Sequence, residues 1–219
     1  MKNLLLICTL LFAGTTFASD NVSTSAWLES DYLYRGASLS GDELAAGLEI
    51  KAADFVLPGL FLSTDVAAWD LDGDNTDTRI DAGFGFGGDL FDGNLGYSLS
   101  VHRVLLSTDV DPYSEVRAGL FSDLSDRFTV FGEISQVVSD SESKDTYLEV
   151  GGRADLADRL WVSVSGAFLR DDRLDETDFN HAEATVGFDI FRGLTLAGTY
   201  SHGGDRLENH HSIGLRYRF

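Results

Sequence analysis

Five histidines are the side chains of this chain best suited to acid–base or metal chemistry near neutral pH. They are His102, His181, His202, His210 and His211. A hydrolase would also need a nucleophile beside one of them, and no serine stands in a nucleophile-elbow motif. The histidine spacings match no common zinc motif, although His202, His210 and His211 could meet near the last loop and capture a metal. We therefore predict no enzyme and no catalytic residue.

An acidic segment, residues 70–77, carries aspartates at alternate positions around Gly73. Carboxylate oxygens suit a hard cation, so Asp70, Asp72 and Asp74 are candidate calcium ligands. The segment differs from an EF-hand, because its glycine is fourth instead of sixth and no glutamate follows at the twelfth position. The plainer interpretation is a solvated acidic loop. Apart from this calcium, no cofactor is expected.

The first eighteen residues differ from the rest of the chain. Lys2 is their only charge, and residues 4–12 form an almost unbroken apolar run. This pattern predicts a secretory signal peptide over residues 1–18, followed by a single domain over residues 19–219. The run is too short to cross a bilayer as a helix. Because the only cysteine, Cys8, lies inside it, the mature chain would have neither a disulfide nor a reactive thiol.

The chain is acidic, with 16 Lys and Arg against 36 Asp and Glu and a formal net charge of −20. Removal of Lys2 with the signal peptide would make this charge −21. Such a charge argues against nucleic acid and anionic membrane surfaces as partners. It fits a solvated surface that keeps the protein soluble in transit as well as a preference for cationic ligands, so charge alone selects no function.

Short turns recur every 32 to 34 residues along the mature chain, at residues 56–60, 90–95, 124–128, 156–160 and 190–194. Between them, apolar and polar residues alternate with the period of two that strands require. Acidic segments between the turns become longer loops, at residues 36–44, 70–77, 105–112, 139–145, 171–178 and 203–209. Five turns and six loops join twelve strands. The chain is thus predicted to be all-β and to close as a transmembrane antiparallel up-and-down β-barrel with periplasmic turns and extracellular loops.

The two faces of the predicted strands differ in polarity. On one strand Arg79 and Asp81 share the inner face, while the outer face carries Ile80, Ala82, Phe84 and Phe86. A shift of one residue would place the charges in lipid. The same alternation sends further side chains outward, namely Leu28, Tyr32, Tyr34, Ala182, Ala184, Val186, Phe188, Ile213, Leu215, Tyr217 and Phe219. A soluble periplasmic sandwich would also alternate, but the signal peptide and the charged second face favour the barrel.

The predicted lumen contains more acidic than basic side chains. The acidic ones are Glu29, Asp31, Glu49, Asp65, Asp81, Glu115, Glu133, Glu149, Glu183 and Asp189. The basic ones are Lys51, Arg79, Arg117, Arg153, Arg216 and Arg218. Their excess of carboxylates could make a pore prefer cations or zwitterions. Alternatively, cross-strand acid–base pairs could hold the wall together around a packed interior.

The segment that follows the first predicted strand resembles a known family. Its residues, Ser30-Asp31-Tyr32-Leu33-Tyr34-Arg35-Gly36-Ala37-Ser38, are similar to the opening motif of the TorF family of small proteobacterial outer-membrane porins. The match continues through Gly47-Leu48-Glu49 and Gly59-Leu60-Phe61. The resemblance implies a barrel that acts as a pore and identifies no catalytic residue. The acidic loops of this chain argue against a neutral solute.

These patterns predict a porin-like passive channel for small polar or cationic solutes in the outer membrane of a Gram-negative bacterium. The alternative is a structural or adhesive barrel with a plugged lumen that acts through its acidic loops, and a barrel enzyme ranks below both. The expected partners are outer-membrane lipid, lipopolysaccharide and small solutes, with no nucleic acid. The barrel-assembly machinery is a further expected partner, because the last strand alternates up to a terminal Phe219.

Overall fold

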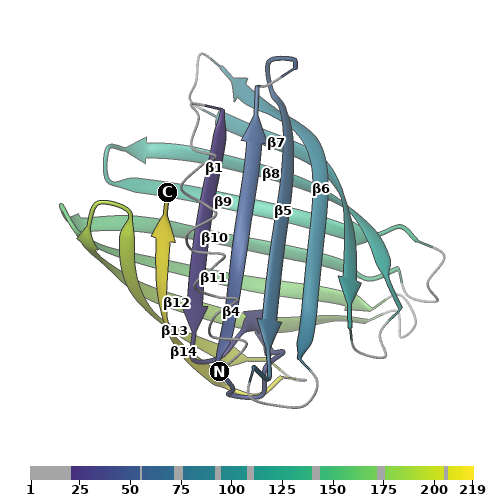
Figure 1. Cartoon of the computed structure of the whole chain (residues 1–219). Coiled ribbons are helices and arrows are strands. Elements are labelled where there is room, and N and C mark those ends of the chain that lie inside the picture. The colour runs from purple at the N-terminus through teal and green to yellow at the C-terminus, as the bar shows by residue number, and fades with distance from the viewer. Residues whose placement is uncertain are drawn as a thin grey trace.

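The computed structural model describes residues 21–54, 56–71, 76–91, 95–107, 111–139, 144–171, 176–204 and 207–219, and in these ranges twelve strands close into one barrel (Figure 1). The strands are β1 (Val22–Glu29), β4 (Ala45–Ala53), β5 (Leu60–Trp69), β6 (Asp77–Leu90), β7 (Leu95–Leu106), β8 (Tyr113–Ser125), β9 (Phe128–Val137), β10 (Thr146–Ala157), β11 (Leu160–Asp171), β12 (Glu176–Phe191), β13 (Leu194–Gly203) and β14 (His210–Arg218). Each pairs antiparallel with its neighbours, and β1 pairs with β14. The predicted twelve-stranded barrel is confirmed. The predicted signal peptide lies outside the described residues.

Tight turns gather at one end of the barrel, which we call the turn end, and longer connections gather at the opposite loop end. Two-residue turns join β8 to β9, β10 to β11 and β12 to β13, with a register shift beside each turn. Gly193 in the last of them has a φ of 85°, and a Cβ there would lie 2.5 Å from the carbonyl oxygen of Arg218. Glycine therefore allows this turn to pack against the end of β14.

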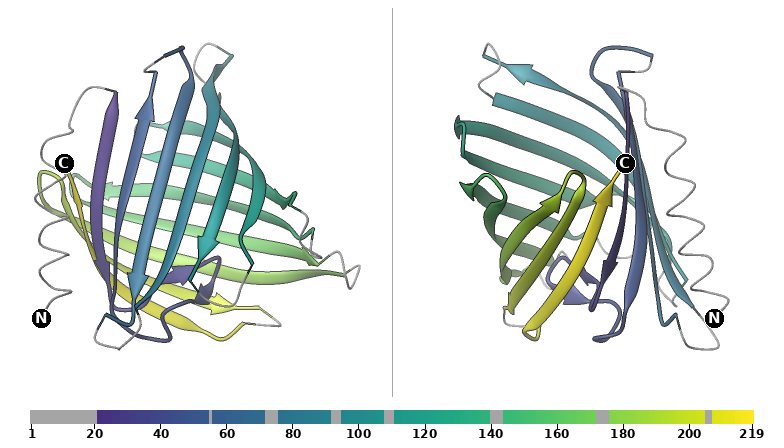
Figure 2. Two further views of the ribbon diagram at one scale, coloured as in Figure 1. Left: turned by 45° about the vertical axis from the view of Figure 1, so that its right-hand side comes forward. Right: turned by 60° about the vertical axis from the view of Figure 1, so that its left-hand side comes forward.

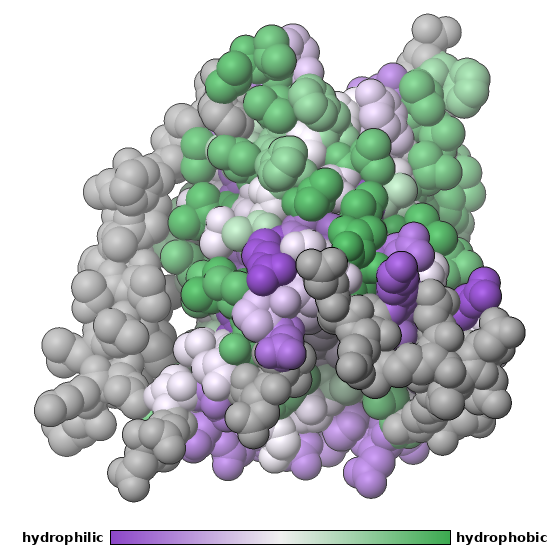
Figure 3. Space-filling model, turned by 90° about the vertical axis from the view of Figure 1, so that its right-hand side faces the viewer, coloured by the Kyte–Doolittle hydropathy of each residue, from purple (hydrophilic) through white to green (hydrophobic). Residues whose placement is uncertain are grey.

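The outer wall of the barrel is apolar and the inner wall is charged. Phe84 and Phe86 on β6 are 56% and 48% exposed, whereas Arg79 and Asp81 on the same strand are 3% and 6% exposed. Apolar residues cover the wall in Figure 3, and hydrophilic residues gather toward the loop end. This distribution suits a wall that faces hydrocarbon outside and a polar lumen inside. No helix in the described ranges has the length and hydropathy to cross a membrane.

The connection between β1 and β4, residues 30–44, folds into the barrel and is here called loop 1. Figure 2 shows its two short strands, β2 (Leu33–Tyr34) and β3 (Ala37–Ser38), inside the ring of strands. The prediction that Tyr32 and Tyr34 face outward was therefore wrong. The reason is that β1 ends at Glu29, so the alternation of apolar residues beyond it no longer reports the face of the wall. The predicted loop over residues 36–44 is a connection at the loop end, but its first part turns into the lumen while residues 41–44 are exposed.

Loop 1 is shaped by a hairpin whose tip is Arg35-Gly36. Their φ angles of 52° and 80° are those of a tight hairpin turn with both central residues left-handed. A Cβ on Gly36 would lie 2.4 Å from the ring of His181, so glycine also allows the tip to reach the far wall. At the base of the loop, the Tyr32 ring stacks on Trp27 at 5.2 Å and lies 5.7 Å from Trp69. These aromatic rings fix the loop to the near wall.

Candidate functional site

The inner wall holds the charged side chains that the sequence pattern assigns to the lumen. Directly opposite residues of antiparallel strands point to the same side, and Glu49 lies opposite Asp65, which lies opposite Asp81. Strand pairing sets the others on this inner face too: Glu29, Lys51, Arg79, Glu115, Arg117, Glu133, Glu149, Arg153, Glu183, Asp189, Arg216 and Arg218. Asp31 lies in loop 1 and is also buried inside the barrel.

The wall from β6 to β8 contains an ion-pair network centred on Asp81. Its Oδ2 lies 2.8 Å from Arg79 Nη2 and 2.6 Å from Arg117 Nη2, and its Oδ1 lies 2.7 Å from His102 Nδ1. Arg117 Nε also donates to Glu115 Oε1 over 2.5 Å, and Glu115 is completely buried. Buried charges are stable only when their partners compensate for lost hydration. The stability of these strands therefore depends on a complete network.

The tip of loop 1 joins this network from across the lumen. Arg35 Nη2 donates to Glu115 Oε2 over 2.9 Å and to Ser135 Oγ over 2.7 Å, on β8 and β9. Its guanidinium lies 4.6 Å from the centre of the Tyr147 ring on β10. The carbonyl oxygen of Arg35 accepts a hydrogen bond from Asn180 Nδ2 on β12 at 2.9 Å. Loop 1 is thus a bridge across the lumen near the loop end.

The base of loop 1 is held by hydrogen bonds around Asp31. Its Oδ1 accepts hydrogen bonds from Ser38 Oγ at 2.5 Å and from Ser40 Oγ at 2.9 Å. Ser40 Oγ also accepts the backbone N–H of Tyr32, and Ser212 Oγ on β14 donates to the carbonyl oxygen of Asp31. The base and the tip of loop 1 are therefore fixed to opposite sides of the barrel.

Two loop 1 side chains have shifted pKa values. Burial raises the pKa of Tyr32 to about 12, although the charge of Arg79 acts in the opposite direction. Burial by itself would lower the pKa of Arg35, but the adjacent Tyr34 and the Glu115 carboxylate outweigh it and hold this pKa above its ordinary value. Tyr32 is therefore neutral and Arg35 charged at neutral pH, as their contacts require.

Ser100, His102 and Asp81 are linked in the order of a hydrolase triad. Ser100 Oγ lies 3.0 Å from His102 Nε2, and His102 Nδ1 lies 2.7 Å from Asp81 Oδ1. No local motif marks this trio, because it forms only when β6 and β7 pair. Two arginines already pair with Asp81, and Ser100 is only 6% exposed. The trio orients His102 within the wall and leaves Ser100 without access to a substrate.

Other carboxylates of the inner wall have no basic partner in the described ranges. Glu29, Glu133, Glu149 and Glu183 have no basic nitrogen within 4.0 Å anywhere in the described ranges. Glu133 lies directly opposite Glu149, which accepts a hydrogen bond from Tyr147 Oη at 3.3 Å. The electrostatic surroundings of Glu29 include Arg216, beyond ion-pair distance, and the carboxylates of Asp65 and Glu183. These four side chains form an acidic belt, the name used below, on β1, β9, β10 and β12.

A cavity of about 690 Å³ runs along β10 to β14, from the turn end to Glu29 and Ser212 beside loop 1. Arginines dominate its charged lining, namely Arg153, Arg159, Arg192, Arg216 and Arg218, with Asp189 among them. The guanidinium of Arg153 lies 4.3 Å from the Trp161 ring, and Arg216 pairs with Glu49 at 3.4 Å. The lumen thus has free space on this side, acidic beside loop 1 and basic at the turn end.

The candidate calcium ligands Asp72 and Asp74 lie outside the described residues, so calcium binding stays a prediction. Asp70 begins their loop with a φ of 53°.

The predicted cluster of His202, His210 and His211 does not form. His210 lies opposite Ser201, which is buried on the inner face, whereas His211 lies opposite the exposed outer Tyr200. Because His202 lies opposite Ala182, it is also on the outer face.

No family model and no curated protein sequence matches the chain. Solved barrels share its fold. The KdgM porin is 11% identical, with a TM-score of 0.67 over 90% of this chain and 99% of that chain. An outer-membrane channel from Pseudomonas putida F1 is 11% identical, with a TM-score of 0.54 over 92% and 96%. Outer membrane phospholipase A from Escherichia coli is 13% identical, with a TM-score of 0.54 over 94% and 95%.

These likenesses, together with the closed antiparallel sheet, define the class of the protein as a porin-like β-barrel. Likeness at this level of identity shows the fold, so the location in a Gram-negative outer membrane stays a prediction. Channels and a phospholipase share this fold, so the function depends on the lumen and the loops. The resemblance to the TorF family stays a prediction, since no sequence match supports it.

Proposed function

We propose that this protein is a passive outer-membrane channel for small polar solutes that prefers cations. The observation that carries the proposal is the acidic belt, whose four carboxylates face the lumen and have no basic partner among the described residues. A ring of carboxylates in a narrow pore lowers the energy of a cation and raises that of an anion. The acidic loops at the loop end would concentrate cations before they reach the belt.

The solute path in this proposal follows the β10–β14 side of the lumen. On the β6–β9 side, Arg35 pairs with Glu115 and joins loop 1 to the wall. On the other side, the cavity continues from Glu29 to the turn end. A solute would therefore meet acidic side chains beside loop 1 and arginines such as Arg218 at the exit. A small zwitterion could find complementary charges in both zones.

Single-channel recording in planar bilayers under a potassium chloride gradient tests the proposal. We expect a small conductance whose reversal potential is shifted toward the equilibrium potential of potassium. A shift toward the equilibrium potential of chloride would refute cation preference and identify the arginine-lined cavity as the selective zone. The orientation that goes with the proposal places the loop end outside the cell.

The second candidate is a barrel with a plugged lumen that acts through its loops. Loop 1 favours it, because the loop crosses the lumen and is bonded to both walls through Arg35 and Asp31. This candidate predicts no conductance from the wild-type protein and a measurable conductance from Arg35→Ala. A wild-type conductance with the potassium preference above would eliminate it.

A further inference from the structure

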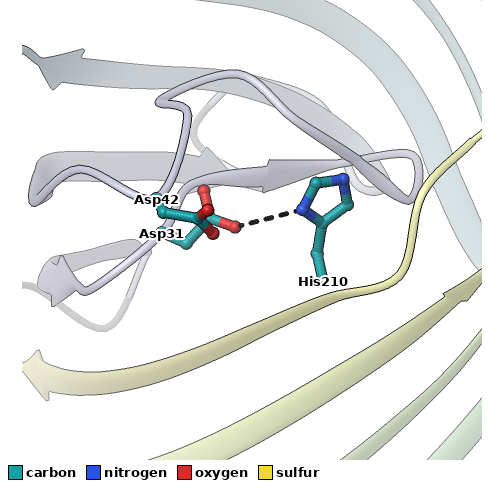
Figure 4. Close-up of side chains that lie close together, drawn as sticks. All are labelled: Asp31, Asp42 and His210. Atoms are coloured by element: carbon teal, nitrogen blue, oxygen red, sulfur yellow. Dashed lines mark ion pairs between the residues drawn. The ribbon is translucent and has the colours of Figure 1, made fainter.

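Three potential metal ligands from distant positions meet at the loop end. Asp31 and Asp42 lie at the two ends of loop 1, and His210 is the first residue of β14. One carboxylate oxygen from each aspartate and one ring nitrogen of His210 all lie within 4.8 Å of one another. Figure 4 shows the two carboxylates side by side and facing the imidazole. Neither the proposed channel function nor the candidate calcium segment involves this group.

The buried carboxylate of Asp31 supplies an independent indication of a cation. Its side chain is 2% exposed, and Oδ1 is occupied by Ser38 and Ser40. Oδ2 is buried and accepts no hydrogen bond in the described part of the chain. It points toward His210 Nδ1 at 3.8 Å, which is too long for a hydrogen bond. A buried carboxylate oxygen without a donor is costly unless a cation compensates it.

We propose that Asp31, Asp42 and His210 bind one divalent transition-metal ion of the zinc type. Imidazole nitrogen with two carboxylate oxygens suits such an ion, whereas calcium and magnesium prefer oxygen ligands alone. Zinc binds these atoms at about 2.0–2.2 Å, so two ligands of one ion lie roughly 3.4 Å apart, close to the separation of Asp31 Oδ2 and His210 Nδ1. Water would complete the coordination.

The geometry also gives the ion a route of access and a role. Asp42 is exposed at the loop end, so the ion can reach the group from solvent. Once bound, it would tie both ends of loop 1 to β14. The Arg35 tip already bonds to β8 and β9, on the other side of the lumen. The ion therefore would stabilise the position of loop 1 across the lumen.

Isothermal titration of the refolded, detergent-solubilised protein with zinc chloride tests the site. We expect one ion per chain, and His210→Ala and Asp42→Asn should each lower the affinity about tenfold or more. His211→Ala is the matched control, because its side chain faces outward one residue away, and it should bind as the wild type does. Absence of binding at millimolar zinc, or an equal loss in His211→Ala, would overturn the proposal.

X-ray absorption spectroscopy of the zinc-loaded wild-type protein covers the case in which a variant folds poorly. One nitrogen and two or more oxygens at about 2.0–2.2 Å are expected, and the nitrogen contribution should disappear in His210→Ala. A coordination shell that contains several histidine nitrogens would assign the ion to other residues and refute the site.

Discussion

The two sides of the lumen use the same residue types with opposite outcomes. On the β6–β9 side, Asp81 and Glu115 are buried and each contacts two arginines. On the β10–β14 and β1 side, Glu29 lines the cavity and Glu183 faces the lumen, and neither has a basic nitrogen within 4.0 Å in the described ranges. Arg35 of loop 1 completes the pairing of Glu115. Asp81 is paired by arginines that belong to the wall itself. Charges in this lumen therefore hold the wall together where arginines pair with them and are available to solutes where the described residues offer no such pair.

Asp81→Asn should have the largest effect on stability. It leaves Arg79 and Arg117 buried without their shared carboxylate, which typically costs about 3–5 kcal/mol in the free energy of unfolding. Denaturant titration of the protein refolded into lipid vesicles measures this loss. The matched change on the open side, Glu183→Gln, should cost under about 1 kcal/mol. Equal losses at the two positions would erase the distinction between the packed and open sides.

Gly36→Ala should release the tip of loop 1. The substitution forces alanine into a φ of 80° and places its Cβ 2.4 Å from His181. Together these effects should lower the free energy of unfolding by about 2–4 kcal/mol. Gly41→Ala is the control, because φ is 63° there but no atom lies within 4 Å. It should cost only about 1 kcal/mol. Bilayer recording should show a larger conductance for Gly36→Ala alone, and an unchanged conductance would show that loop 1 does not narrow the pore.

Arg35→Ala removes the contact that joins loop 1 to the packed side. Its hydrogen bonds to Glu115 and Ser135 are lost, and hydrogen bonds to charged groups contribute about 1.5–3 kcal/mol each at most. We expect lower stability and larger conductance. Arg153→Ala serves as the comparison, since its pair with Asp155 is about half exposed and should contribute under about 1 kcal/mol. A greater loss of stability in Arg153→Ala would contradict the assignment of the two sides.

Phe219→Ala should have the smallest effect on the folded barrel. The ring packs edge-on against Tyr217 at 4.9 Å, a contact that contributes about 0.5–1.5 kcal/mol. If the assembly machinery also recognises the last strand, the yield of folded barrel in cells should fall much more than the free energy of unfolding does. Phe191→Ala, at an exposed aromatic of the turn end outside the last strand, should leave that yield unchanged.

The barrel could be predicted from the sequence because strands bury one face with a period of two. Arg79 and Asp81 alternate with Ile80, and this simple pattern repeated around recurring turns determines both the strand number and the register. Loop 1 could not be predicted in this way. Tyr32 and Tyr34 continue the alternation of β1, yet their rings lie inside the barrel. The inward path depends on contacts with Trp69 and distant strands, which no local pattern records.

For the lumen, the sequence predicts which residues face inward but not which of them contact one another. The inner face of each strand follows from its alternation, but the pairing of Asp81 with Arg117 joins positions that are 36 residues apart. The contact of Arg35 with Glu115 spans 80 residues. Which carboxylates remain unpaired therefore depends on strand order, strand tilt and the inward fold of loop 1 together.

The most direct test of the account is the reversal potential of single channels in which the acidic belt has lost charge. Wild-type protein should prefer potassium, and Glu29→Gln combined with Glu183→Gln should remove most of that preference while conductance persists. Glu208→Gln, the same type of substitution at one exposed position of the loop end, should keep it. Full potassium preference in the double variant would contradict the central claim that the unpaired carboxylates of the open side select the solute.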